Sequence, residues 1–269
     1  MNDFLRALRG VDFEWTAHLD AIWSDSPFDV PAIQGRMRAE VVEEIEALRS
    51  SRSVSSPLGL PLVGPAGAGK THLLSALRKE VLDRGMFFVL VDMTDVSDFW
   101  ETVLLGYVRS LQHAMPNGRT QLAQAIGQIT RDAPGLDFSF ADLVKSRPPR
   151  LLNHLEALIR ALTPRHPSQV REHQDVLRAL VLLASDDFDL QDLGYKWLLG
   201  IGIEDEDGFA RGFRSPRQSQ ISIVQGLSWF LGMAGSTVLA LDQLDAIVAE
   251  HNLLSSIDDG QEPSARQKT

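Results

Sequence analysis

The chain contains 269 residues and carries a formal net charge of −10, from 26 Lys and Arg against 36 Asp and Glu. This balance excludes a surface coated with positive charge for general nucleic-acid binding, while a local basic patch stays compatible with it. The sequence has no cysteine, which excludes disulfides, thiol catalysis and cysteine-ligated zinc. Hydrophobic residues make up 44% of the chain, which is enough for a packed core.

Residues 1–57 are expected to form a helical segment followed by a linker. A helix is predicted from Pro31, because proline suits the first helical turn and apolar residues then recur at three- and four-residue steps. Residues 50–57 are rich in serine, as connectors are. The first ten residues lack the pattern of a secretory signal, so we expect a cytoplasmic protein. Only five of the 26 basic residues are lysine, which favours a GC-rich bacterial origin.

Residues 58–96 contain a complete phosphate-binding motif. Two apolar runs of strand length, residues 58–63 and 86–91, flank a helical pattern that ends at Gly85. Between the first run and the helix, the eight residues GPAGAGKT match G-x-x-x-x-G-K-[ST] in full. Strand, loop and helix is the setting that this motif requires. We therefore predict that residues 58–96 form the P-loop half of a nucleotide-binding core.

Each part of the loop has a chemical role. Glycines let the backbone adopt conformations that a side chain would block, so that the amides of residues 66–71 point inward at an anion. Lys70 is expected to reach the β- and γ-phosphates, and the Thr71 hydroxyl to bind Mg²⁺. The predicted nucleotide-binding residues are Gly64, Pro65, Ala66, Gly67, Ala68, Gly69, Lys70, Thr71 and His72.

Residues 97–234 are mostly helical in pattern and are interpreted as an insertion. Helices are predicted at 98–115, 119–131, 149–162, 168–184, 188–199 and 216–233. Residues 218–241 carry no charge and are long enough to span a bilayer. Their content of Gln, Ser and Thr instead favours a buried helix, a turn at Gly235 and a buried strand, so no membrane span is expected.

Residues 235–254 are predicted to return to the core as a short strand, residues 238–241, and a following helix. Asp242 ends that strand and is the predicted second magnesium ligand beside Thr71, while Asp92 is assigned to the edge of the pocket. The structural alternative is that Asp242 only caps the next helix. Residues 255–269 are polar and are predicted to be a disordered tail.

The residues after Asp242 bear on hydrolysis. Many P-loop ATPases place Glu directly after this Asp to align the attacking water, whereas this chain has Gln243. A carboxamide orients a water but does not take its proton. Asp245 is the nearest following carboxylate. The predicted catalytic set is therefore Lys70, Asp242, Gln243 and Asp245, and it supports nucleotide binding better than fast hydrolysis.

With these residues the chain resembles P-loop ATPases of the AAA+ class, in particular the initiator or origin-recognition branch and related bacterial ATP-binding proteins. The resemblance covers GPAGAGKTHLL, TVLALDQLD and the upstream helix PAIQGRMRAEVVEEIEAL. It implies an α/β P-loop core with a parallel sheet, ATP and Mg²⁺ as cofactors, and an adenine pocket near Phe28, Val30 and Ile33.

Two departures from that family affect the expected assembly. Lys70 and Asp242 are 172 residues apart, which is far more than a compact P-loop core needs, so the residues between them are interpreted as containing a helical insertion. Only 27 residues of the sequence follow Asp242. The family continues with further strands, a sensor residue, an arginine finger and a helical lid. The sheet is therefore expected to be incomplete at its C-terminal side. A protein partner, an oligomer or the chain's own missing half would complete it.

Two charged clusters lie in the predicted insertion. Arg211, Arg214 and Arg217 either contact phosphates of a nucleotide or nucleic acid, or are solvated loop residues. The acidic run at residues 204–207, with Lys196 to Gly200 before it, is interpreted as a solvated turn beside a packed aromatic rather than a metal site.

Four functions compete. The first is an ATP-binding module that couples nucleotide to assembly or regulation, with nucleic acid reached through a larger complex. A GTPase is disfavoured, because no Asn-Lys-x-Asp motif occurs. A small-molecule kinase is disfavoured, because only Arg266 follows Asp242 as a phosphate clamp. A non-hydrolysing, nucleotide-dependent interaction protein stays open because of Gln243.

Overall fold

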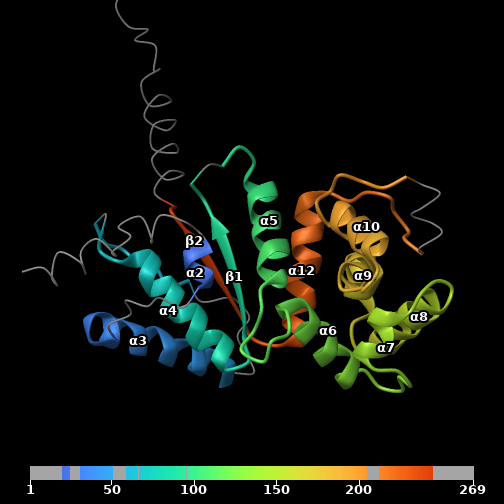
Figure 1. Cartoon of the computed structure of the whole chain (residues 1–269), viewed down its shortest axis with the longest axis horizontal. Helices are drawn as coiled ribbons and strands as arrows, with labels where there is room; N and C mark the ends of the chain where they lie inside the picture. The colour runs from blue at the N-terminus through green and yellow to red at the C-terminus, as the bar shows by residue number, and fades with distance from the viewer. Residues whose placement is uncertain are drawn as a thin grey trace, which may run out of the picture.

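The computed structural model describes residues 20–24, 31–50, 59–65, 67–94, 96–204 and 212–244. Within these ranges the fold is mixed α/β and mostly helical, with a small parallel sheet (Figure 1). The helices are α2 Asp20–Trp23, α3 Pro31–Ser50, α4 Lys70–Asp83, α5 Phe99–Gln112, α6 Gln121–Asp132, α7 Phe140–Lys145, α8 Arg150–Leu162, α9 Pro167–Leu183, α10 Phe188–Leu198 and α12 Gln220–Ala234. The strands are β1 Phe87–Asp92 and β2 Thr237–Asp242.

The two strands run parallel and in register, from Phe87 opposite Thr237 to Asp92 opposite Asp242. Helices α4 and α5 cover opposite faces of this sheet (Figure 1). On the α5 face, Gly106 lies so close to β1 that an added Cβ would be 2.7 Å from Val91 Cγ2. Glycine at this position therefore lets α5 lie directly against the strand.

The outer edge of β1 is closed by side chains instead of a third strand. Phe88 N–H donates to Gln121 Oε1 at 2.8 Å, and Gln121 Nε2 donates to the Phe88 carbonyl at 2.9 Å. Leu90 N–H donates to Ser110 Oγ at 3.0 Å. Both capping side chains are 1% exposed. The buried amide and hydroxyl thus satisfy backbone groups that water cannot reach.

The helices from α5 to α12 share one hydrophobic core with the sheet. Helix α12 packs against α5, α6 and α9, and Tyr107 Oη lies 3.0 Å from Ser228 Oγ between α5 and α12. Gly226 allows α12 to approach α9, because a Cβ there would lie 2.6 Å from Val176 Cγ2. The region predicted as an insertion is therefore packed onto the strand that precedes it.

Most predicted helices are confirmed within a few residues, and so are the two strands predicted at residues 86–91 and 238–241. The strand predicted at residues 58–63 is wrong for its described part, residues 59–63, which contain no strand. A strand forms only when its backbone groups are paired, and no backbone hydrogen bond joins residues 59–63 to another described segment. Val63 is 91% exposed. Helix α7 was not predicted, because its six residues are too few to show a helical period.

The uncharged stretch 218–241 forms the end of a loop, α12, an extended Gly235 and β2, as its polar content predicts. Within the described ranges, no helix combines the length and the apolar character needed to cross a membrane. The serine-rich connector from residue 51, the predicted helix at 243–254 beyond residue 244, and the tail at 255–269 lie outside the described residues.

We expect Gln121→Ala to destabilise the fold strongly. It leaves the Phe88 N–H and carbonyl buried without partners, at a cost of about 2–4 kcal/mol in unfolding free energy. Urea denaturation measures this cost. The matched control is Gln128→Ala on the same helix, where the amide only meets Asp132 at the surface; we expect a loss within about 0.5 kcal/mol. Equal losses in both variants would refute the edge-closing role of Gln121.

His173 on α9 gives the stability a pH dependence. Burial lowers the pKa of its imidazole, and the nearby Glu172 carboxylate opposes this effect. The unfolded chain therefore takes up this proton first, and stability present above pH of about 6.5 is lost as the pH falls toward the lowered folded-state pKa. We expect His173→Leu to flatten this part of the profile, measured as urea midpoints at several pH values. An unchanged slope would show that other groups cause the dependence.

Candidate functional site

The loop before α4 owes its shape to glycines. Gly67 and Gly69 have φ of 77° and 81°, in the left-handed region that side chains disfavour. Ala68 N–H donates to the Pro65 carbonyl at 3.2 Å, and Leu73 N–H donates to the Gly69 carbonyl at 2.9 Å. The loop therefore turns tightly and passes directly into the first turn of α4, whose N-terminus favours anions. Ala66, part of the predicted nest, lies outside the described residues.

Lys70 folds back over this loop. Its Nζ donates to the Gly64 carbonyl at 2.7 Å and to the Pro65 carbonyl at 3.3 Å. These bonds hold the ammonium group beside the backbone that the motif predicts to surround phosphates. A bound anion would compete with two carbonyl oxygens for this charge. His72 follows on α4 and is half-buried.

Thr71 and Asp242 meet at the start of α4 and the end of β2. The Thr71 hydroxyl donates to Asp242 Oδ2 at 3.2 Å, although the two residues are 171 positions apart. Asp242 is 6% exposed, and its other oxygen, Oδ1, accepts the Gln243 N–H at 3.0 Å. The predicted pair of magnesium ligands is thus in direct contact.

Asp92 has a different environment, although it lies opposite Asp242 in the ladder. Its Oδ1 accepts the Thr94 N–H at 3.0 Å and also the Thr94 hydroxyl. The carboxylate therefore caps its own turn. Asp-x-Thr after a strand is a local turn signal, and the sequence interpretation did not use it.

Two oxygens in this position suit Mg²⁺. An octahedral Mg²⁺ holds its ligands at about 2.1 Å, which places neighbouring ligands about 3 Å apart. The separation of 3.2 Å between Thr71 Oγ1 and Asp242 Oδ2 is close to that value. One hydroxyl and one carboxylate leave most positions for phosphate oxygens and water, as Mg²⁺ in nucleotide sites prefers. The donor set fits the ion.

Gln243 is held in a strained conformation beside this pair. Its φ of 61° is the one positive φ of a non-glycine residue in the described part of the chain. The left-handed region costs such a residue roughly 1–2 kcal/mol. Asp245 lies outside the described residues, as do Phe28 and Val30 of the expected adenine pocket, and the side chain of Ile33 is not described.

The arginine cluster is part of another region. Arg211 lies outside the described residues, and Arg214 and Arg217 are exposed. The backbone N–H groups of Arg214 and Ser215 donate to the buried Asp175 carboxylate, which anchors this segment to α9. The segment also contributes to an open hollow of about 470 Å³ beside the start of α12, lined by Gly200, Arg217, Gln218, Ser219 and Gln220.

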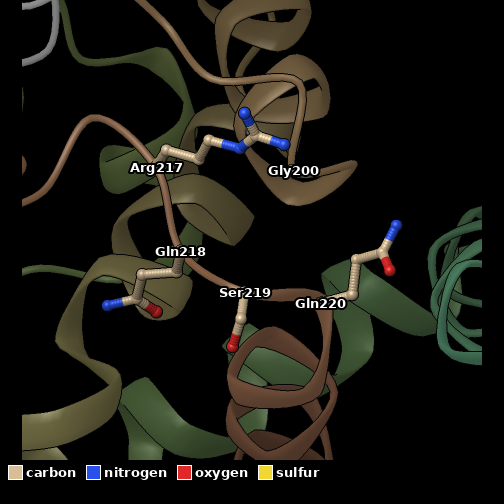
Figure 2. Close-up of a pocket in the computed structure, with 5 residues that line it drawn as sticks. All are labelled: Gly200, Arg217, Gln218, Ser219 and Gln220. Atoms are coloured by element: carbon tan, nitrogen blue, oxygen red, sulfur yellow. The ribbon is translucent and has the colours of Figure 1, made fainter.

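Figure 2 shows that the side chains of this hollow point in different directions. None of the described loop residues from Gly64 to Thr71 lines it. The neighbouring Trp197 is fully buried, stacks on Phe213 and donates its Nε1–H to the Ser215 carbonyl at 3.0 Å. This supports the packed-aromatic interpretation of that region. Of the acidic run, only Glu204 is described.

Comparison of the chain with protein-family models, with curated proteins and with solved structures gives no match. Its function must therefore be inferred from its own residues.

We expect Gln243→Gly to stabilise the protein. Relief of the left-handed backbone gains roughly 1–2 kcal/mol, and the greater freedom of the unfolded glycine chain offsets about 0.5–1 kcal/mol of it. Urea denaturation measures the net gain. Leu244→Gly is the matched control, because residue 244 has no positive φ and should lose stability. A loss in both variants would show that Gln243 is not strained.

Proposed function

We propose that this chain is the ATP-binding module of a P-loop ATPase similar to the AAA+ class, acting with Mg²⁺ in a bacterial cytoplasm. The observation that carries the proposal is the contact between Thr71 and Asp242. A Gly-rich turn followed by Lys-Thr also occurs by chance, but chance does not bring a buried carboxylate from a distant strand end to that threonine. The P-loop core and the AAA+ resemblance belong to the same proposal.

The proposed roles follow from the positions of the groups. Backbone N–H groups of the loop and of the first turn of α4 bind the phosphates, and Lys70 exchanges its carbonyl partners for phosphate oxygens. Thr71 and Asp242 would hold Mg²⁺ in place of their mutual hydrogen bond. Mg²⁺ held there would supply positive charge that offsets the charge of the phosphates.

Hydrolysis by the chain alone is proposed to be slow. At the ends of the two strands, Asp242 is engaged with Thr71 and Asp92 with Thr94. Gln243 has no basic group to accept a proton from water. This favours a second candidate function, a nucleotide-dependent interaction protein that binds ATP without turnover. In both cases a protein partner or a larger assembly distinguishes the ATP-bound chain from the ATP-free chain. Contact with nucleic acid is made by that larger assembly.

The direct test is titration with a fluorescent ATP analogue and Mg²⁺. We expect Lys70→Ala to weaken binding by about 10- to 100-fold, because a charge-assisted contact of about 1.5–3 kcal/mol is lost. Lys79→Ala is the matched control on the same helix, where the ammonium group pairs with Asp83 at the surface, and it should bind like the wild type. Asp242→Asn should abolish the Mg²⁺ dependence of affinity.

Other outcomes would replace the proposal. Equal binding by Lys70→Ala and wild type would refute the loop as the phosphate site. Displacement of the analogue by GTP in preference to ATP would favour a GTPase. Phosphate release followed in the same samples separates the two candidates, because steady release by the isolated chain would require a catalytic base and contradict the non-hydrolysing function.

A further inference from the structure

Asp92 lies beside the candidate site, at the carboxyl end of β1. It pairs in register with Asp242 of β2, and such neighbours point to the same face of a sheet whose strands are about 4.8 Å apart. Asp242 contacts Thr71 on α4, which identifies this face as the one that α4 covers. Val91, the residue before Asp92, meets α5 at Gly106, so alternation along β1 also directs Asp92 to the α4 face. The Asp92 carboxylate therefore shares a face with the two proposed metal ligands.

The two oxygens of this carboxylate differ in their contacts. Oδ1 accepts the Thr94 N–H at 3.0 Å and also the Thr94 hydroxyl. Oδ2 accepts no hydrogen bond from any residue in the described ranges. Asp92 is half-buried, and two hydrogen bonds from one neighbour restrict the rotation of its carboxylate. One anionic acceptor is thus held open beside the candidate site.

The other side chains considered at this end of the sheet are less suited to hold a water molecule. Gln243 is exposed, and its carboxamide makes no hydrogen bond to a described residue. Asp98 Oδ1 accepts an N–H of the first turn of α5 at 2.9 Å and caps that helix. Asp242 is engaged with Thr71 and with the Gln243 N–H. Of these, Asp92 combines a restrained carboxylate with a free oxygen.

We propose that Asp92 positions the water molecule that attacks the γ-phosphate of ATP, by accepting a hydrogen bond at Oδ2, and that Thr94 holds Asp92 in place. This inference rests on the proposed function and concerns its hydrolysing form. The water oxygen forms a bond to the γ-phosphorus while the bond from that phosphorus to the β–γ bridging oxygen breaks. The bridging oxygen leaves with the electron pair as part of ADP, and both water protons stay on the phosphate product. Asp92 therefore orients the water without taking a proton, which agrees with slow hydrolysis.

The first test is Asp92→Asn. Asparagine has one acceptor oxygen, which the Thr94 N–H occupies, so an NH₂ group replaces the free Oδ2 and no longer accepts from water. We expect phosphate release under single-turnover conditions to fall about 10- to 100-fold, because a charge-assisted hydrogen bond is lost. Affinity for the fluorescent ATP analogue with Mg²⁺ should change by less than about twofold, because the lost contact belongs to the transition state.

Asp98→Asn is the matched control. It makes the same chemical change six residues further along the chain, and asparagine also caps a helix. We expect this variant to bind the ATP analogue and to release phosphate like the wild type.

A binding measurement separates the proposed role from a structural one. ADP with aluminium fluoride and Mg²⁺ imitates the transition state of phosphoryl transfer, including the attacking water. Isothermal titration calorimetry should show that Asp92→Asn binds this complex about 10- to 100-fold more weakly than the wild type. Thr94→Val should show the same selective loss to a smaller extent. Thr94→Ser keeps both donors and should bind and release like the wild type.

The outcomes distinguish this inference from the proposed function. A wild type that does not bind the ATP analogue would overturn both. Binding by the wild type without any phosphate release, or equal release by the wild type and Asp92→Asn, would overturn the role of Asp92 alone. Equal weakening of ATP-analogue binding and of ADP–aluminium fluoride binding in Asp92→Asn would show a structural role and would also overturn it.

Discussion

The contact between Thr71 and Asp242 is the constraint on which the account of this protein depends. It joins the first turn of α4 to the last residue of β2. The chain between them brings β2 back to pair with β1, parallel and in register. The loop before α4 is shaped by two left-handed glycines, and Lys70 lies over it. The loop that carries the G-x-x-x-x-G-K-T motif, the Lys70 ammonium group and a buried carboxylate therefore meet at one end of a parallel sheet, where ligands of α/β folds commonly bind.

The helical part of the chain is coupled to this end of the sheet by packing. Helix α5 lies against β1 through Gly106, α12 lies against α9 through Gly226, and α12 leads through Gly235 directly into β2. Gln121 of α6 closes the edge of β1. The helices therefore support the strand that carries Asp242.

Much of this arrangement was predictable from local patterns. The periodicity of apolar residues predicts the long helices, and apolar runs ending in Asp predict β1 and β2. The loop motif predicts the partners Thr71 and Asp242. The segment at residues 58–63 shows the limit, because an apolar run of strand length stays unpaired when no neighbour is present. The role of Gln121 was not predictable either, because it depends on a contact with Phe88, which is 33 residues away. The fold-back of Lys70 and the strain at Gln243 are likewise products of tertiary geometry.

The central claim is that Thr71 and Asp242 form one metal–nucleotide site. Paramagnetic broadening in NMR spectra, with Mn²⁺ replacing Mg²⁺ in the presence of ATP, tests it most directly. The account predicts broadening centred on the amides of residues 67–72 and 242–243 that appears only when ATP and Mn²⁺ are both present. Broadening centred on the hollow beside Arg217, or an unspecific loss of signal over the acidic surface, would contradict it.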